Sequence, residues 1–260
     1  MKKIIIILCL MMVMVGCAPV HDNTDNNTDN KPSPTDNPTN NTDNNNKKEE
    51  TTDEGVNMNV EITTINKEAS DGKENEGKET VELKQAKVIF NRLPETLEEL
   101  QEIDRTGEDG KFVTMALLIC AFKTWTPDDT ETCEAMMKEL LNSPTVENNY
   151  TDYTRSFVKE RMNQNDKWEY IADAYFDGAQ SLNAYLPDDP LTITLREYPY
   201  APQESTMYGT KLSIEKIVIE FEGADSERSI SVYQDPKDNK WYVWSDTYKA
   251  LLADIKFPAK

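Results

Sequence analysis

The chain has 260 residues and a formal net charge of -20, from 28 basic and 48 acidic side chains, and 37% of its residues are apolar. Nucleic acid is excluded as a partner because phosphate backbones are held by clusters of Lys and Arg, which this sequence lacks. The same acidity argues against a folded part that lies flat on anionic lipid. The apolar deficit is concentrated before residue 82, which predicts a polar N-terminal part and a folded C-terminal part.

Residues 1–17 have the pattern of a secretory signal peptide. Lys2 and Lys3 precede an uninterrupted apolar run from Ile4 to Val15, and Cys17 follows after one glycine. The run is shorter than the roughly 20 residues that a membrane-spanning helix needs. We therefore expect export of the chain, with removal of this segment.

The end of that segment, Met14-Val15-Gly16-Cys17, resembles the lipobox of bacterial lipoproteins, although a lipobox usually has Leu where Met14 stands. The resemblance implies that Cys17 is lipidated, with palmitate among its acyl chains, so that the mature protein is anchored to the membrane without spanning it. We expect it on the extracytoplasmic face of the cell membrane. The alternative is an ordinary signal peptide or N-terminal anchor in which Cys17 is incidental.

Residues 18–80 consist mainly of Asn, Asp, Thr and charged residues. With so few apolar side chains, this segment cannot offset the entropy lost on ordering, and it is predicted to be a disordered linker. It contains one weak strand-like patch, Val60–Ile65. Its Thr-Asp-Asn triplets lack the glycine and terminal glutamate of a calcium-binding loop, so we predict no calcium site there.

Residues 81–260 are predicted to form a single α+β domain. It begins with a short strand or extended arm at Val81–Phe90. Apolar residues then recur every three or four positions, which predicts helices, and one of these is apolar around most of its circumference, as in a buried central helix. The expected helices are one after Thr96, Phe112–Phe122, one starting at Pro127 with Thr126 as its N-cap, and Thr151–Met162.

The apolar period changes to two in the last part of the domain, which predicts strands. The expected strands are Leu191–Tyr198, Leu212–Phe221, Ser229–Tyr233 and Lys240–Trp244. The turn residues of Asp235–Asn239 join the last two in a hairpin. Tyr170–Phe176 fits either a helical turn or a strand, and Tyr248–Ile255 a short closing helix. The prediction is a cluster of about four helices packed on a C-terminal antiparallel sheet of about four strands.

Several segments of this domain are distinctive, namely Phe90–Pro94, Ala116–Phe122, Tyr175–Ala179, Leu191–Pro199 and Trp241–Trp244. Together they resemble a family of uncharacterised lipoproteins from low-GC Gram-positive bacteria that carry a C-terminal domain of unknown function. The resemblance covers about Val88 to Pro258 and implies a single domain. Its motifs are structural, so it implies no activity.

Cys120 and Cys133 lie on consecutive predicted helices. An extracytoplasmic location permits a disulfide between them if their Cα atoms lie within about 7 Å. Cys120 is also part of an apolar run, where a free buried thiol behaves as a small hydrophobic side chain. Both alternatives remain open from the sequence.

The only histidine, His21, falls in the predicted linker, so the domain has no histidine base, histidine metal ligand or Ser-His-Asp triad. Glycine-rich phosphate loops and dinucleotide fingerprints are absent from the sequence. We therefore expect no cofactor and no metal. Acid pairs such as Asp128-Asp129 are typical of helix starts and turns.

Tyr198, Tyr200 and Tyr208 form an aromatic segment between two expected strands, and tyrosines are common in recognition surfaces. We expect a binding or interaction domain for an extracytoplasmic protein or a cell-wall component, held by these three residues. Alternatively, the tyrosines pack their loop onto the sheet. Two other functions stay open: an envelope glycan hydrolase with two carboxylates about 5–10 Å apart, and a small-molecule-binding domain resembling the NTF2-like fold.

Overall fold

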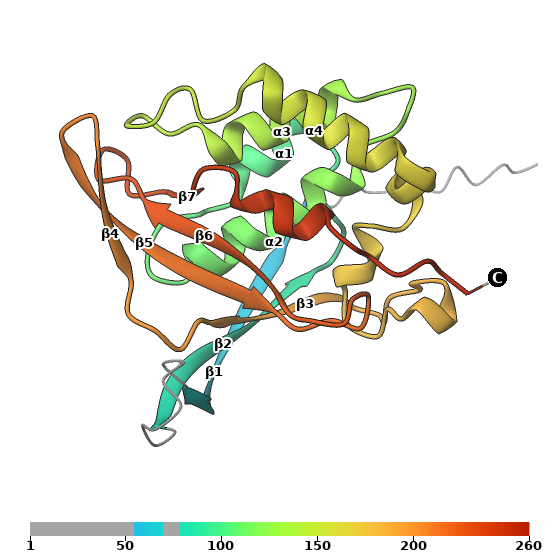
Figure 1. The fold of residues 1–260 in the computed structure, drawn as a ribbon, viewed down its shortest axis with the longest axis horizontal. Helices are drawn as coiled ribbons and strands as arrows, with labels where there is room; N and C mark the ends of the chain where they lie inside the picture. Colours follow the sequence, from blue (N-terminus) through green and yellow to red (C-terminus); the bar gives the residue numbers. More distant parts are fainter. Residues whose placement is uncertain (1–54, 70–78, 260) are drawn as a thin grey trace, which may run out of the picture. The chain divides into compact units, whose positions relative to one another are not determined.

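The computed structural model describes residues 55–69 and 79–259, which belong to one compact unit (Figure 1). The expected signal peptide, Cys17, His21 and most of the expected linker lie outside the described residues. Within the described part the fold is α+β, as predicted. An antiparallel sheet packs against helices, and the main differences from the sequence prediction lie in the number of elements.

The sheet has seven antiparallel strands in the described residues, where about four were expected. Their order is β1-β2-β3-β5-β6-β7, and β4 pairs with β5 off this path. The strands are β1 (Met58–Ala69), β2 (Glu79–Phe90), β3 (Leu191–Glu197), β4 (Gln203–Met207), β5 (Thr210–Ile219), β6 (Arg228–Gln234) and β7 (Trp241–Val243). The four expected C-terminal strands and the entering strand are thus confirmed as β3, β5, β6, β7 and β2.

The prediction of a disordered linker over residues 18–80 is wrong for Met58–Ala69, which forms the ordered 12-residue strand β1. It pairs with β2 over its whole length, from Met58 opposite Phe90 to Ala69 opposite Glu79. Seven of the 12 β1 side chains are exposed and the other five are half-buried, which explains its polar composition. Main-chain pairing with β2 and the packing of Met58 and Val60 against the core stabilise a segment whose composition alone does not.

The described residues contain four α-helices and four short 3₁₀ helices, more helical segments than predicted. They are α1 (Leu97–Glu102), α2 (Gly110–Lys123), α3 (Glu131–Leu141), α4 (Asp152–Asn163), η1 (Gln164–Glu169), η2 (Asp173–Tyr175), η3 (Ser181–Asn183) and η4 (Thr247–Leu252). The ambiguous Tyr170–Phe176 segment contains η2, and the expected closing helix is η4. Thr96 caps α1 by accepting a hydrogen bond from the Glu99 amide, as predicted.

Helix α3 begins four residues later than predicted. The Thr126 hydroxyl oxygen accepts a hydrogen bond from the Asp129 amide at 2.9 Å, which closes a turn around Pro127 instead of opening a helix. Thr130 is the residue that precedes the first helical turn. The sequence signals of a turn and of a helix start are the same residue types, so the pattern does not distinguish them.

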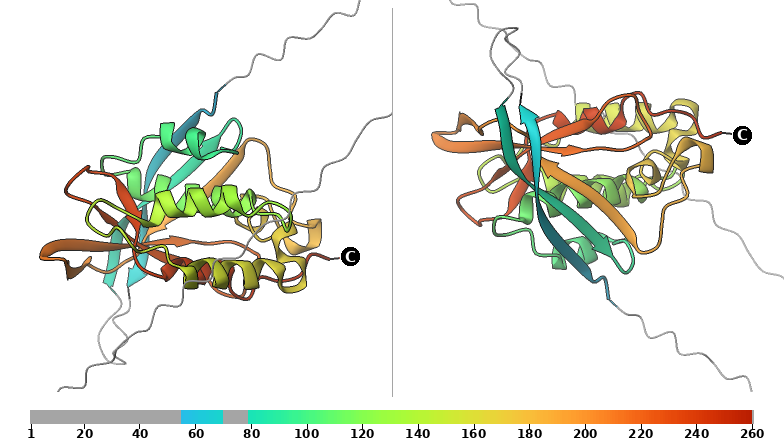
Figure 2. Two further views of the ribbon diagram at one scale, coloured as in Figure 1. Left: turned by 90° about the horizontal axis from the view of Figure 1, so that it is seen from above. Right: turned by 90° about the horizontal axis from the view of Figure 1, so that it is seen from below.

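Helix α2 is the centre of the core, because every residue from Gly110 to Phe122 is buried. It lies between the sheet and α3 (Figures 1 and 2). A Cβ on Gly110 would lie 2.2 Å from the carbonyl oxygen of Arg105, so the first residue of α2 has room for no side chain. The predicted buried central helix is confirmed.

The hairpin between β6 and β7 is held by a buried carboxylate. Asp235 is fully buried and accepts hydrogen bonds from the hydroxyls of Ser143 and Thr145 and from the amides of Thr145 (2.8 Å) and Lys237 (2.9 Å). The Tyr233 hydroxyl donates to Ser143 at 2.9 Å. This network joins the hairpin to the connection between α3 and α4.

We predict that Asp235→Ala lowers the free energy of unfolding by about 2–4 kcal/mol at pH 7, because buried donors lose their acceptor. Burial raises the pKa of Asp235, but the hydrogen bonds from Ser143, Lys237 and Thr145 outweigh it, and the net pKa lies below the usual value. The stabilisation is therefore present above about pH 4 and is lost as the pH falls below it.

Denaturant unfolding of wild type and Asp235→Ala at pH 7 and pH 3 tests this, and the difference should shrink at pH 3. Asp225→Ala is the control, since this aspartate is 93% exposed and its removal should leave stability unchanged. A difference between wild type and Asp235→Ala that is the same at both pH values would contradict the prediction.

Candidate functional site

The sheet divides where β3 ends. β3 pairs with β2 only along Gln85–Phe90, so Glu79–Lys84 has β1 on one side and no described strand on the other. The chain continues from β3 through Tyr198–Pro202, whose two prolines have no amide N–H to donate to a neighbouring strand. It then forms β4 beside β5. We call the gap between the β1–β2 and β4–β5 arms the fork; Figure 1 shows the two arms diverging.

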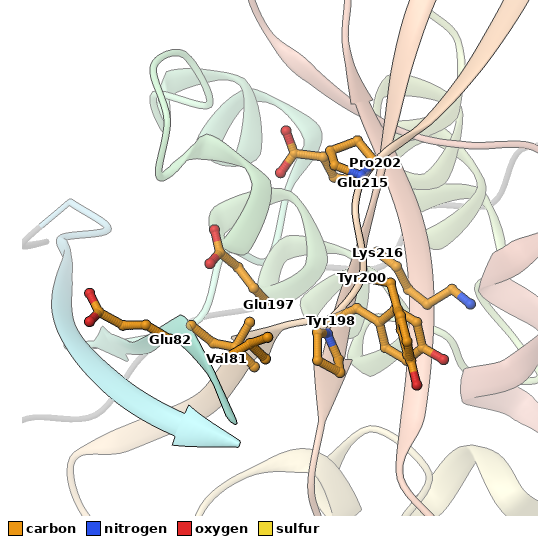
Figure 3. A pocket seen from close by; sticks show the side chains of 10 residues that line it. Val81, Glu82, Glu197, Tyr198, Tyr200, Pro202, Glu215 and Lys216 are labelled. Carbon is orange, nitrogen blue, oxygen red and sulfur yellow. The ribbon is translucent and has the colours of Figure 1, made fainter. Parts of the chain in front are cut away.

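A pocket of about 290 Å³ lies in the fork, and Figure 3 shows the side chains that line it. They come from β2, from the end of β3 and the loop after it, and from β5. Because successive residues of a strand point to opposite faces of a sheet, the pocket has two chemically different walls. One faces α2, and the other faces away from it.

The wall on the α2 side is acidic and consists of Glu82, Glu197 and Glu215. Lys111 of α2 holds two of these residues: its Nζ lies 2.6 Å from Glu197 Oε1 and 2.9 Å from Glu215 Oε2. The second oxygen of Glu197 accepts the main-chain N–H of Lys84 at 2.9 Å. Glu197 therefore connects the core helix to the free edge of β2.

The Lys111 side chain is only 4% exposed. Burial lowers its pKa, but the hydrogen bonds to Glu197 and Glu215 outweigh that effect, and its net pKa is above the usual value. The ammonium is therefore charged at neutral pH and fixes both carboxylates in the fork. Sequence reasoning missed this cluster, because its members are separated by 86 and 104 residues in the chain.

The wall on the other side is apolar and aromatic. Val81 and Leu83 of β2 lie across from Tyr198 and Tyr200, whose ring centroids are 4.9 Å apart. Figure 3 shows the two rings together beside Lys216, whose Nζ lies 4.4 Å from the centroid of the Tyr198 ring. The structure thus brings two of the three expected tyrosines together in one pocket.

Tyr208 lies elsewhere, at the tip of the β4–β5 hairpin, and is 77% exposed. Tyr208 and Gly209 both have positive φ, at 48° and 79°, and form the tight turn of this hairpin. Tyr208 lines a second pocket of about 280 Å³ together with Pro144, Thr145 and Lys237. Strand β4 separates it from the other tyrosines, and the Tyr-Gly pair is the sequence signal that identifies this turn.

Cys120 and Cys133 are both free and buried, so the structure shows the thiol alternative and no disulfide between them. Burial raises the pKa of both thiols. A nucleophilic role requires the thiolate, which this environment disfavours. Both residues act as small apolar side chains of α2 and α3.

A larger pocket, of about 570 Å³, lies at the C-terminal end of α2 and is lined by Leu93, Leu191, Arg92 and Lys123. Its two cations already have partners, since Arg92 pairs with Glu99 and Lys123 with Asp173 at 2.6 Å. The space between the sheet and the outer helices is filled by α2. The small-molecule cavity of the NTF2-like alternative therefore has no counterpart in that space.

Within residues 55–69 and 79–259, His, Cys, Asp and Glu side chains nowhere gather in the groups of three or more that hold a metal ion. In the same ranges, none of the helices has both the length and the apolar character needed to cross a membrane.

A family model described as a domain of unknown function, DUF6935, matches residues 92–259. The match includes Lys111, the loop Tyr198–Pro202 and all of β3 to β7, and it begins after β2. No curated protein and no solved structure matches the chain.

We predict that Lys111→Met lowers the free energy of unfolding by about 1–3 kcal/mol, because Glu197 and Glu215 would then face each other without a counter-ion. The triple variant Lys111→Met, Glu197→Gln, Glu215→Gln should regain most of this loss, since no uncompensated charge remains. Denaturant unfolding of wild type and both variants measures the two effects. A triple variant no more stable than the single one would show that packing of the lysine stem, rather than charge, dominates.

Proposed function

We propose that this chain, which belongs to the DUF6935 family of domains of unknown function, is a ligand-binding domain anchored by lipid at Cys17 to the extracytoplasmic face of the cell membrane. The ligand is an envelope component, either a protein or part of the cell wall. The family assigns no activity, so the proposal is supported by the fork and by the N-terminal sequence.

The pocket in the fork is the observation that carries the binding function. Tyr200 is 41% exposed and lies against Tyr198, which gives a partner a broad apolar surface with hydroxyl groups at its rim. Glu197 and Glu215 supply acceptors that Lys111 holds in place. An aromatic surface beside fixed polar groups is the usual composition of a recognition site.

The location is supported by the sequence of residues 1–17, where a charged start and a short apolar run lead to Cys17. An acylated cysteine retains a protein at a membrane because each buried methylene contributes about 0.8 kcal/mol. A domain anchored in this way meets envelope components at high local concentration, which suits a binding site of modest affinity.

The glycan hydrolase alternative receives less support. Glu197 and Glu215 do lie together in a pocket, but both contact the same ammonium, that of Lys111. A glycoside hydrolase needs one carboxyl of its pair to hold a proton for the leaving group. Here the ammonium of Lys111 and the main-chain N–H of Lys84 already engage the two oxygens of Glu197.

We predict that Cys17→Ala abolishes incorporation of labelled palmitate in cells and moves the protein out of the membrane fraction. Cys120→Ala is the matched control and should be labelled as the wild type is, because that thiol is buried in the core. Wild-type protein recovered in the cytosol with residues 1–17 present and without palmitate would overturn the proposed location.

We predict that Tyr198→Ala with Tyr200→Ala reduces the recovery of envelope material by about tenfold or more, because truncating a central aromatic pair removes most of the contact energy. The full chain, immobilised through a C-terminal tag, is incubated with solubilised envelope fragments. The full chain is needed because a fragment beginning at Val81 would lack β1.

Tyr208→Ala is the matched control. It removes an exposed tyrosine from the pocket at the tip of the β4–β5 hairpin, outside the fork, and should leave recovery unchanged. Equal recovery by wild type and the double variant, or no recovery by wild type, would remove the fork as the binding site.

A further inference from the structure

We propose that the fork binds one extended segment of a protein chain whose side chains alternate between basic and apolar, and that this segment pairs as an added strand with the free edge of β2. The inference rests on the proposed binding function and identifies the class of ligand. Three features of the fork support it: an unpaired strand edge, the direction of its main-chain groups, and the different chemistry of its two walls.

The unpaired edge is the part of β2 that extends beyond β3. β1 covers one side of Glu79–Lys84, and on the other side β3 turns away after Glu197. Strand edges with free N–H and C=O groups are templates for an incoming strand. Pro199 and Pro202, in the loop after β3, explain why the chain's own next segment does not pair with this edge of β2.

The direction of the main-chain groups follows from Lys84. Its N–H points into the fork, where it donates to the Glu197 carboxylate at 2.9 Å. Main-chain groups of a strand alternate in direction with period two, so the N–H and C=O groups of Glu82 and Thr80 point into the fork as well. These groups offer an incoming strand four hydrogen bonds.

The chemistry of the walls determines the sequence of the incoming strand. Its alternate side chains would point to opposite faces of the sheet. On the α2 side they meet the carboxylates of Glu82, Glu197 and Glu215, and on the other side the rings of Tyr198 and Tyr200. Basic residues suit the first wall and apolar residues the second, and the net charge of -20 favours the approach of a basic segment.

A labelled heptapeptide of sequence TKVKVKT is the probe, and fluorescence anisotropy with the full chain measures its affinity. We expect its acidic analogue, TEVEVET, to bind at least about tenfold more weakly. Two further analogues carry N-methyl groups on residues 2 and 4 or on residues 3 and 5. One of these alternate sets should abolish binding and the other should be tolerated, because only one faces β2.

The matching change in the protein is Glu82→Pro, which removes an N–H that faces the fork while leaving the hydrogen bonds between β1 and β2. We expect it to weaken binding of the peptide by about tenfold or more. Glu82→Ala retains the N–H and separates the loss of the carboxylate from the loss of the donor.

Thr64→Pro is the matched control. Thr64 lies opposite Lys84, so its N–H points to the outer edge of β1, away from the fork. Binding should be unchanged in this variant. If Glu82→Pro fails to fold, the two N-methylated peptides test the same hydrogen bonds on the wild-type protein.

Equal effects of the two N-methylated sets, or weakening by Thr64→Pro and not by Glu82→Pro, would overturn the inference. The inference would also be wrong if the wild-type protein does not bind the peptide but does bind envelope material or chitohexaose, and if the Tyr198→Ala, Tyr200→Ala variant loses that binding. In that last case the proposed binding function stands and only the ligand class is wrong.

Discussion

The interaction on which this domain depends is the contact of one buried ammonium with two carboxylates. Lys111 belongs to α2, the helix at the centre of the core, and its side chain ends between Glu197 of β3 and Glu215 of β5. An unpaired buried lysine destabilises the folded state, so the contact with both carboxylates favours this arrangement of α2, β3 and β5. The same contact fixes the pocket wall on the α2 side, because Lys111 of the core pairs with Glu197 and Glu215, which line that wall.

The fork beside this contact follows from the course of the chain after β3. β3 and β5 are brought together at Glu197 opposite Ile217 and then separate, since the chain after β3 contains two prolines. β4 takes the place beside β5, and β2 continues with β1 alone. The fork is therefore a direct consequence of a strand interrupted by residues that cannot donate to a ladder. Its position in the fold is set by five residues of sequence, Tyr198–Pro202.

Much of the fold could be predicted from the sequence, wherever the spacing of apolar residues indicates which side chains are buried. The apolar residues of Phe112–Phe122, which cover most of the helix circumference, identified the buried helix, and alternation identified β3, β5 and β6. β1 was assigned to a disordered linker because its side chains are largely polar, apart from the weak strand-like patch Val60–Ile65, and its order comes from pairing with β2 along its whole length. β4 (Gln203–Met207) was missed because its residues are mostly polar and exposed, and its order comes from pairing with β5 across the turn at Tyr208-Gly209.

Some residues of the candidate site could likewise be predicted from the sequence and others could not. Tyr198 and Tyr200 could be selected from the sequence because they are aromatic residues in a loop with two prolines. Lys111, Glu197 and Glu215 could not, since the chain contains 28 basic and 48 acidic residues and nothing in the local pattern singles out these three. Only burial distinguishes Lys111, and burial of a charged side chain depends on partners that are far away in the chain.

The pairing of β1 with β2 has a consequence for access. The polypeptide enters the sheet at Met58, which lies opposite Phe90, whereas the fork begins at Lys84 and continues toward Glu79. Entry point and fork therefore occupy opposite ends of one hairpin, separated by roughly 20 Å at about 3.4 Å per residue. A partner that pairs with Glu79–Lys84 would therefore lie at the far end of this hairpin from Met58, where β1 begins.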